Sequence, residues 1–256
     1  MTRLMSTVAL AAAALFSAAT AQAGYITFAG EDLNNSSSNP LASLPNSVAA
    51  QNAFLAGLTG VGIETFEGQT TGATTPLAIT FPGFGGSLTA TLNGGGTVRS
   101  QAAGTASAGR YSVPSASSTK FWEIRAGSGG TFAVDFSTKI AAFGFFGIDI
   151  GDYGGTLSID LMDGATVLQT LSVGNTVGSG GSTDGSVLYF GVIAQNPGDL
   201  FNRIRFNSTL GGGDTFAFDN FTIAQREQVV TTVPEPASLA LVAAALLGLG
   251  VARRRA

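Results

Sequence analysis

Carboxylates are the side chains that could do chemistry in this chain, because its 256 residues include neither cysteine nor histidine. These absences exclude a thiolate nucleophile, a Ser-His-Asp triad and a typical zinc site, which need a thiol or an imidazole. A calcium site needs neither a thiol nor an imidazole, since calcium is bound by about six to eight oxygen atoms from carboxylates, carbonyl groups and water. Calcium is therefore the metal to consider.

Glu67 and Asp219 form the first candidate calcium site. In "FAFDNFTI", residues 216–223, the apolar side chains before Asp219 and after Asn220 have opposite parity, which predicts a β-bulge between them. If the first and last strands of the domain lie side by side, Glu67 comes close to Asp219. This pair is a candidate Ca²⁺ site; the alternative is that Glu67 caps a loop and Asp219 accepts hydrogen bonds from local backbone amides.

The segment "DIGDYGG", residues 149–155, offers a second arrangement of the same kind. Asp149 and Asp152 are separated by flexible glycine, but the complete spacing of an EF-hand loop is missing. We therefore interpret this segment as a solvated turn.

A glycosidase is the enzyme class that remains, because it needs only two carboxylates. Glu64, Glu67 and Glu123 could serve as acid and nucleophile, but any chain with 16 acidic residues meets this requirement loosely. We expect no catalytic residues and no enzyme activity. Trp122 and Tyr153 carry rings that could stack on a sugar, yet the alternation in "KFWEI" places Trp122 in the core.

The elements that must position these residues are mainly strands. The chain has 36 glycines and only 11% charged residues, which favours turns and strands over helices. Apolar residues alternate with polar or small ones in "TPLAITFPG", "TFAVDFS", "GTLSIDLMDG" and "NRIRFNS". About ten strands at turn spacings of roughly 8–15 residues predict an all-β fold, a two-sheet antiparallel β-sandwich that is jelly-roll-like.

Two segments depart from simple alternation. Residues 47–58 predict one short helix, capped by Ser47, ended by Gly57 and Gly60 and packed on a sheet edge. In "KIAAFGFFGIDIG", residues 139–151, too many side chains are apolar for one face. This predicts either a bulge between Phe145 and Phe146 or a central strand buried on both faces.

The N-terminus carries the pattern of a secretory signal peptide. Arg3 precedes an apolar run, and Ala21 and Ala23 flank Gln22 in a small-x-small cleavage pattern. We predict a signal peptide over residues 1–23, cleaved after Ala23. The alternative is a stable N-terminal membrane helix.

The C-terminus carries a second hydrophobic segment. Pro234 and Pro236 prevent a helix from running through them, so a helix begins near Ala237. Residues 237–252 are uncharged and span roughly 24 Å as a helix, slightly less than the ~30 Å hydrocarbon core. The arginines that follow favour the cytoplasmic side and can snorkel. We predict a transmembrane helix with the domain outside.

This tail resembles the PEP-CTERM sorting signal of Gram-negative bacteria, in which a Pro-Glu-Pro motif, a hydrophobic helix and a basic cluster occur in this order. The matching residues are Pro234, Glu235 and Pro236, then Arg253, Arg254 and Arg255. The resemblance implies cleavage near the motif by an exosortase-type membrane protease. It also implies an exported protein that accompanies exopolysaccharide production and biofilm formation.

The domain organisation follows from these ends: a signal peptide at 1–23, a β-sandwich at 24–228 and the sorting signal at 229–256. The central domain resembles the β-sandwich domains often found before this tail. The resemblance lies in "FEG" at 66–68, "FGFFGIDIGD" at 143–152 and "FAFDNFTI" at 216–223, and it implies the fold alone.

The net charge of the processed chain limits the classes of partner that it can bind. Loss of both terminal segments leaves 8 cationic residues against 16 acidic ones, or 15 if Glu235 is also lost. Nucleic acid is therefore a poor partner. We expect an exported protein of the cell surface or extracellular matrix, with a structural or binding role related to polysaccharide or biofilm. The alternatives are a secreted carbohydrate-active enzyme and a permanently membrane-anchored surface protein.

Overall fold

The computed structural model describes residues 21–22, 24–125, 132–178, 183–209 and 214–230, and it arranges them as two antiparallel sheets. The eight-stranded sheet has the order β1-β2-β12-β9-β14-β7-β6, and β3 also pairs with β14. Its strands are β1 (Ala21–Gln22), β2 (Tyr25–Asp32), β3 (Ile63–Glu64), β6 (Thr97–Ser100), β7 (Lys120–Arg125), β9 (Ala142–Ile148), β12 (Val187–Ala194) and β14 (Thr215–Ala224).

The six-stranded sheet has the order β11-β10-β13-β8-β5-β4. Its strands are β4 (Leu77–Gly83), β5 (Gly86–Asn93), β8 (Ala133–Ile140), β10 (Leu157–Asp163), β11 (Thr166–Val173) and β13 (Phe201–Ser208). Two short 3₁₀ helices, Pro197–Asp199 and Arg226–Gln228, lie in connections. The mostly β architecture, with two antiparallel sheets and one α-helix, agrees with the expected sandwich; its jelly-roll character stays a prediction.

Aromatic rings fill the core between the sheets. Phe206 of β13 lies 5.4 Å from Phe145 of β9 and 5.1 Å from Phe218 of β14, measured between ring centroids. Trp122 is fully buried and stacks on Phe132 at 6.2 Å. The prediction that Trp122 belongs to the core is confirmed.

Strand β9 is the central strand buried on both faces. All seven of its residues are buried, and its pairing with β12 runs without a register shift. Phe143 and Phe145 face the core between the sheets, whereas Phe146 and Ile148 belong to the second core under the helix. Of the two alternatives for this segment, the two-sided burial is confirmed.

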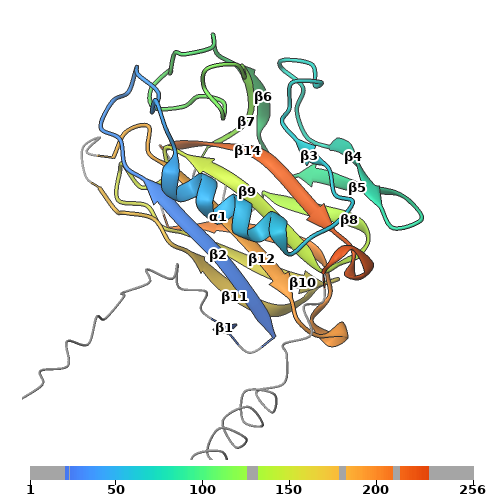
Figure 1. The fold of residues 1–256 in the computed structure, drawn as a ribbon. Coiled ribbons are helices and arrows are strands. Elements are labelled where there is room, and N and C mark those ends of the chain that lie inside the picture. Colours follow the sequence, from blue (N-terminus) through green and yellow to red (C-terminus); the bar gives the residue numbers. More distant parts are fainter. Residues whose placement is uncertain (1–20, 23, 126–131, 179–182, 210–213, 231–256) are drawn as a thin grey trace, which may run out of the picture.

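Helix α1 (Pro45–Ala56) covers the outer face of the eight-stranded sheet across β2 and β12 (Figure 1). The predicted position at a sheet edge is therefore wrong. The cause is local: the Phe54 ring lies over Gly144 and Gly191, and a Cβ atom at Gly191 would lie 2.6 Å from that ring. Two glycines in neighbouring strands make the hollow that seats the helix.

The N-terminus of α1 is capped from another strand. Its N-cap residue is Leu44, which makes no side-chain cap bond, so the predicted cap by Ser47 is wrong. The Asp32 carboxylate at the end of β2 accepts bonds from the Asn46 and Ser47 amides at 3.0 and 2.9 Å. Gly57 is the C-cap residue, as expected.

The predictions for the two chain ends fall almost entirely outside the described residues. Of the predicted signal peptide, only Ala21 and Gln22 are described; they form β1, which pairs with β2. Ala23, the Pro-Glu-Pro motif, the helix at 237–252 and the three terminal arginines lie outside. Within the described ranges, no helix has the length and apolar character needed to cross a bilayer.

Candidate functional site

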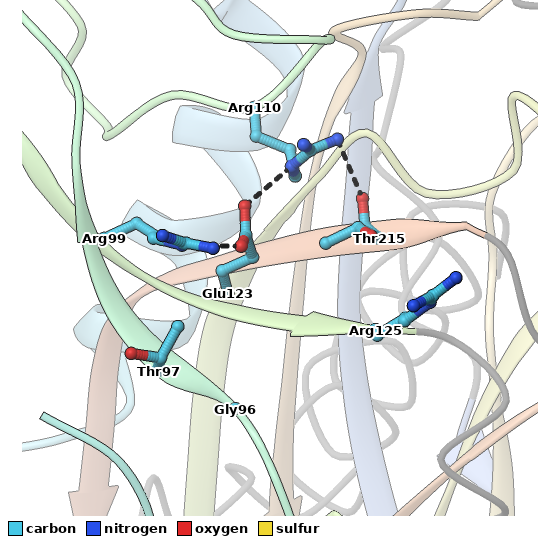
Figure 2. Close-up of a pocket in the computed structure, with 7 residues that line it drawn as sticks. All are labelled: Gly96, Thr97, Arg99, Arg110, Glu123, Arg125 and Thr215. Atoms are coloured by element: carbon cyan, nitrogen blue, oxygen red, sulfur yellow. Dashed lines mark hydrogen bonds and ion pairs between the residues drawn. The ribbon is translucent and has the colours of Figure 1, made fainter. Parts of the chain in front are cut away.

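An open cleft of about 530 Å³ lies at the β6–β7 end of the eight-stranded sheet (Figure 2). Strand pairing brings its walls together, because Thr97 of β6 is opposite Glu123 of β7, and Thr215 of β14 is opposite Arg125. The loop between β6 and β7 supplies a further side chain. The lining residues are Gly96, Thr97, Arg99, Arg110, Glu123, Arg125 and Thr215.

Three of the lining side chains are arginines, and two of them pair with one carboxylate. Glu123 Oε1 lies 2.8 Å from Arg99 Nε, and its Oε2 lies 2.9 Å from Arg110 Nε (Figure 2). The Arg99 side chain is 59% exposed, whereas that of Glu123 is 15% exposed. Together with Arg125, the lining carries more positive than negative charge. Guanidinium groups bind planar carboxylates, sulfates and phosphates through paired hydrogen bonds.

Gly96, which lines the cleft, packs against the aromatic core. Its φ angle is +104°, and a Cβ atom there would overlap the Trp122 ring. Only glycine combines this backbone conformation with such a close approach. The chain at Gly96 therefore lies directly on the buried indole.

Arg110 connects the cleft with a group of acidic side chains. Besides its bond to Glu123, its Nη1 lies 3.5 Å from Asp149 Oδ2 and donates to the Ala108 carbonyl at 2.8 Å. Gly109 packs directly on the Asp149 carboxylate, since a Cβ atom there would overlap it. One guanidinium thus contacts both the cleft and the acidic group.

The acidic cluster, as we name Asp149, Asp152, Asp184 and Asp214, is more buried than the predicted solvated turn. Asp149 and Asp152 are each 1% exposed, so the interpretation of this segment as solvated is wrong. Burial raises the pKa of Asp149 to about 7 and that of Asp152 to about 8, and the neighbouring carboxylates add to both. Burial also raises the pKa of Asp214.

Asp219 occupies the predicted bulge. Its pairing with β9 shifts register between Asp219 and Thr222, and Asn220 has a φ angle of +52°. The Asp219 carboxylate is fully buried and accepts bonds from Ser112 Oγ, the Val113 amide and the Asn220 amide at 2.7, 2.8 and 2.7 Å. Burial raises its pKa well above the ordinary value, and Glu67 adds to this.

Glu67 lies close enough to Asp219 to act on its charge, as the sequence suggested, and has its own donors. Its Oε1 accepts from the Thr119 and Lys120 amides at 2.6 Å each, and its Oε2 from Thr119 Oγ1 at 2.9 Å. Although burial raises the pKa of Glu67, these bonds outweigh it and the net shift is downward. All four carboxylate oxygens of the pair are thus used in hydrogen bonds, while calcium binding there stays a prediction.

The other residues considered for catalysis or sugar stacking lie in different places in the fold. Glu64 accepts bonds from the Phe66 amide and Gln69, and Glu123 belongs to the cleft. Tyr153 is 63% exposed.

The arginines of the cleft, Asp184 and Asp214 were not among the residues predicted from the sequence. The arginines come from two strands and the loop between them, and the two aspartates lie in glycine-rich loops, so only the strand pairing identifies these groups. The available signal was positional, because Asp184 and Asp214 precede strands and Asp149 follows one.

Comparisons with solved structures give distant similarities. The chain is 14% identical to the xylanase 10B CBM22-1–GH10 modules of Clostridium thermocellum complexed with xylohexaose, with a TM-score of 0.26 over 43% of this chain and 22% of that one. It is 13% identical to a Stig cyclase of Fischerella sp. TAU, with a TM-score of 0.31 over 64% and 85% of the two chains. It is 14% identical to the K2 cleaved adhesin domain of Lys-gingipain, with a TM-score of 0.26 over 64% and 97%.

These TM-scores are low, and nothing about the function of this chain follows from them. The chain spans about a fifth of the length of the first of these structures. No curated protein gives a significant sequence match.

The tail gives a specific match. A profile of the PEP-CTERM protein-sorting motif matches residues 232–255, the segment with the Pro-Glu-Pro, apolar and arginine-rich parts. This motif implies export, membrane-anchored sorting and processing by an exosortase, which is a membrane protein. The chain is therefore one that carries a PEP-CTERM protein-sorting motif at residues 232–255.

Proposed function

We propose that this chain is an exported binding protein of the cell surface or extracellular matrix, and that its arginine-lined cleft binds an acidic polysaccharide without cleaving it. Export and sorting rest on the tail motif. The observation that carries the binding role is the arginine lining of the cleft. Three of the eight cationic residues left after loss of both ends gather in this one cleft of an otherwise acidic protein.

The chemistry of the cleft suits a polymer with carboxylate or sulfate groups. Arg99 is largely exposed and shares Glu123 with Arg110, so a ligand carboxylate can approach Arg99 while Glu123 keeps a second partner. An open cleft at the sheet edge can also take the middle of a long chain. Neutral glucans lack the charge that this lining would recognise.

Arg99→Gln tests the proposal. A charge-assisted hydrogen bond contributes about 1.5–3 kcal/mol, so its loss should weaken binding about tenfold or more. The full-length protein in detergent is titrated with polygalacturonate, and with dextran as the neutral polymer. We expect binding to polygalacturonate only, weakened by added salt because the contact is ionic.

Arg203→Gln is the matched control, because Arg203 pairs with Asp135 on the other sheet and its side chain is 40% exposed. It should leave the affinity unchanged. Equal binding of dextran, or equal loss of affinity in both variants, would contradict the proposal. Release of new reducing ends from polygalacturonate would favour the carbohydrate-active enzyme instead.

A further inference from the structure

The acidic cluster gathers at one end of three neighbouring strands. Strands β12, β9 and β14 are adjacent and antiparallel, and Ile148 at the end of β9 pairs with Val187 of β12 and Ala217 of β14. Asp149 therefore follows β9 at the same end where Asp184 precedes β12 and Asp214 precedes β14. Asp152 lies in the loop after β9.

The spacing of these carboxylates fits a single cation. One oxygen from each of Asp149, Asp152 and Asp184 lies within 4.8 Å of the others. Two oxygens that are each about 2.4 Å from a common calcium ion are at most about 4.8 Å apart. Asp214 contacts the Asp152 carboxyl group and so lies beside this group of three.

Buried oxygens without partners are an independent sign of a ligand. Asp152, 1% exposed, directs its carboxyl group at Asp184 and Asp214, and its Oδ1 has no hydrogen-bond partner among the described residues. Asp214, 6% exposed, likewise has an unpartnered Oδ2 in that part of the chain. Leaving buried charged oxygens unpaired is costly, and coordination to a metal removes this cost.

The available positive charge is too small for the cluster. Arg110 forms an ion pair with Asp149 at 3.5 Å, but it also pairs with Glu123. Within the described ranges, no ion pair reaches Asp152, Asp184 or Asp214 (salt bridges within 4 Å). A divalent cation would supply the missing charge.

The donor set selects calcium among divalent cations. All the side-chain ligands are oxygens, which hard cations prefer, and the chain has no thiol or imidazole for a softer metal. Calcium accepts irregular coordination by several carboxylates from loops. Magnesium instead needs a regular octahedron and usually keeps several waters.

We propose that Asp149, Asp152 and Asp184, with Asp214 beside them, bind one calcium ion, which holds the segment preceding β12 to the end of β9. This site is distinct from Glu67 and Asp219. It does not depend on the ligand of the cleft.

Calcium titration of the EDTA-treated full-length protein in detergent tests the proposal. We expect one equivalent to bind per chain and saturating Ca²⁺ to raise the melting temperature by about 5 °C or more. Asp152→Asn should weaken binding at least tenfold. In EDTA this variant should melt no lower than the original protein, because one of several mutually repelling carboxylates is gone.

Two control variants locate the site. Asp160→Asn removes a buried carboxylate of the other sheet and should keep the calcium response. Glu67→Gln should keep it as well. A melting temperature independent of Ca²⁺, equal stabilisation by Mg²⁺, or a response lost in Glu67→Gln but kept in Asp152→Asn would each overturn the assignment.

Discussion

Asp160 shows how a single carboxylate can be stabilised on the outer face of the six-stranded sheet. Its Oδ2 accepts from Arg205 Nη2 at 2.6 Å and Asn207 Nδ2 at 2.9 Å, and its Oδ1 from Thr170 Oγ1 at 2.6 Å. Burial alone would raise the pKa of Asp160. The bonds from Thr170, Asn207 and Arg205 outweigh burial and lower it.

The lowered pKa of Asp160 predicts a pH-dependent effect of Asp160→Asn. A carboxyl group with a lower pKa in the folded state stabilises the protein above its unfolded pKa of about 3.9, and this contribution is lost as the pH falls. At pH 7 the variant should lose about 1 kcal/mol of unfolding free energy. Urea denaturation at pH 7 and pH 3 should show the two proteins converging at the lower pH.

Asp163→Asn is the comparison for this measurement. Asp163 pairs with Lys139, and the two side chains are 40% and 50% exposed. Exposed pairs contribute little, so the change at pH 7 should stay within about 0.5 kcal/mol. If the loss of unfolding free energy in Asp160→Asn did not vary with pH, it would contradict the conclusion that the ionised Asp160 carboxylate stabilises the fold.

At the scale of elements, one ring and one carboxylate are prominent among the contacts that hold α1 on the sheet. Phe54 fills the hollow over Gly144 and Gly191, and Asp32 holds the first turn. The Phe54 ring also packs edge-on against Phe28 at 5.8 Å. Loss of the Phe54 ring should therefore weaken the packing of the helix on the sheet.

Phe54→Ala should destabilise the protein by about 3–5 kcal/mol, because it removes a fully buried ring and leaves a cavity. Chemical denaturation followed by circular dichroism measures this loss. Val48→Ala, on the same helix at a site 37% exposed, should change stability by about 0.5 kcal/mol or less. Similar losses in both variants would show that the helix is held in another way.

Features that depend on a pattern of neighbouring residues could be predicted from the sequence. The apolar run around Phe145 indicated a buried strand, and the change of parity at Asp219 indicated the bulge, because both depend on neighbouring residues. The cap by Asp32 and the joining of Asp184 with Asp149 depend on pairing between distant segments. No local pattern encodes that pairing, so these contacts could not be predicted.

At the scale of the whole molecule, the sorting motif predicts what a native preparation contains. An exosortase that cleaves near Pro234–Pro236 would remove the arginines at 253–255, and signal peptidase would remove residues 1–23. Intact-mass spectrometry of the protein from its own cells should therefore give a chain that begins at Gly24 and ends near the motif. In cells without the protease, the arginine-containing tail should remain.

A mass that includes the arginines in protease-containing cells would support the permanently membrane-anchored alternative. A mass that includes residues 1–23 would contradict export by signal-peptide cleavage. These masses test sorting separately from ligand binding.

The strand directions place the described chain ends and the cleft at opposite poles of the sandwich. Tyr25 at the start of β2 pairs with Ala194, and Ala224 at the end of β14 pairs with Ala142 at the start of β9, so both termini of the domain share one pole. Thr215, in the cleft wall, begins the ten-residue strand β14, roughly 30 Å from that pole. A domain tethered through its tail would therefore hold the cleft arginines Arg99, Arg110 and Arg125 at the pole farthest from the membrane. There they would be turned toward the surroundings of the cell.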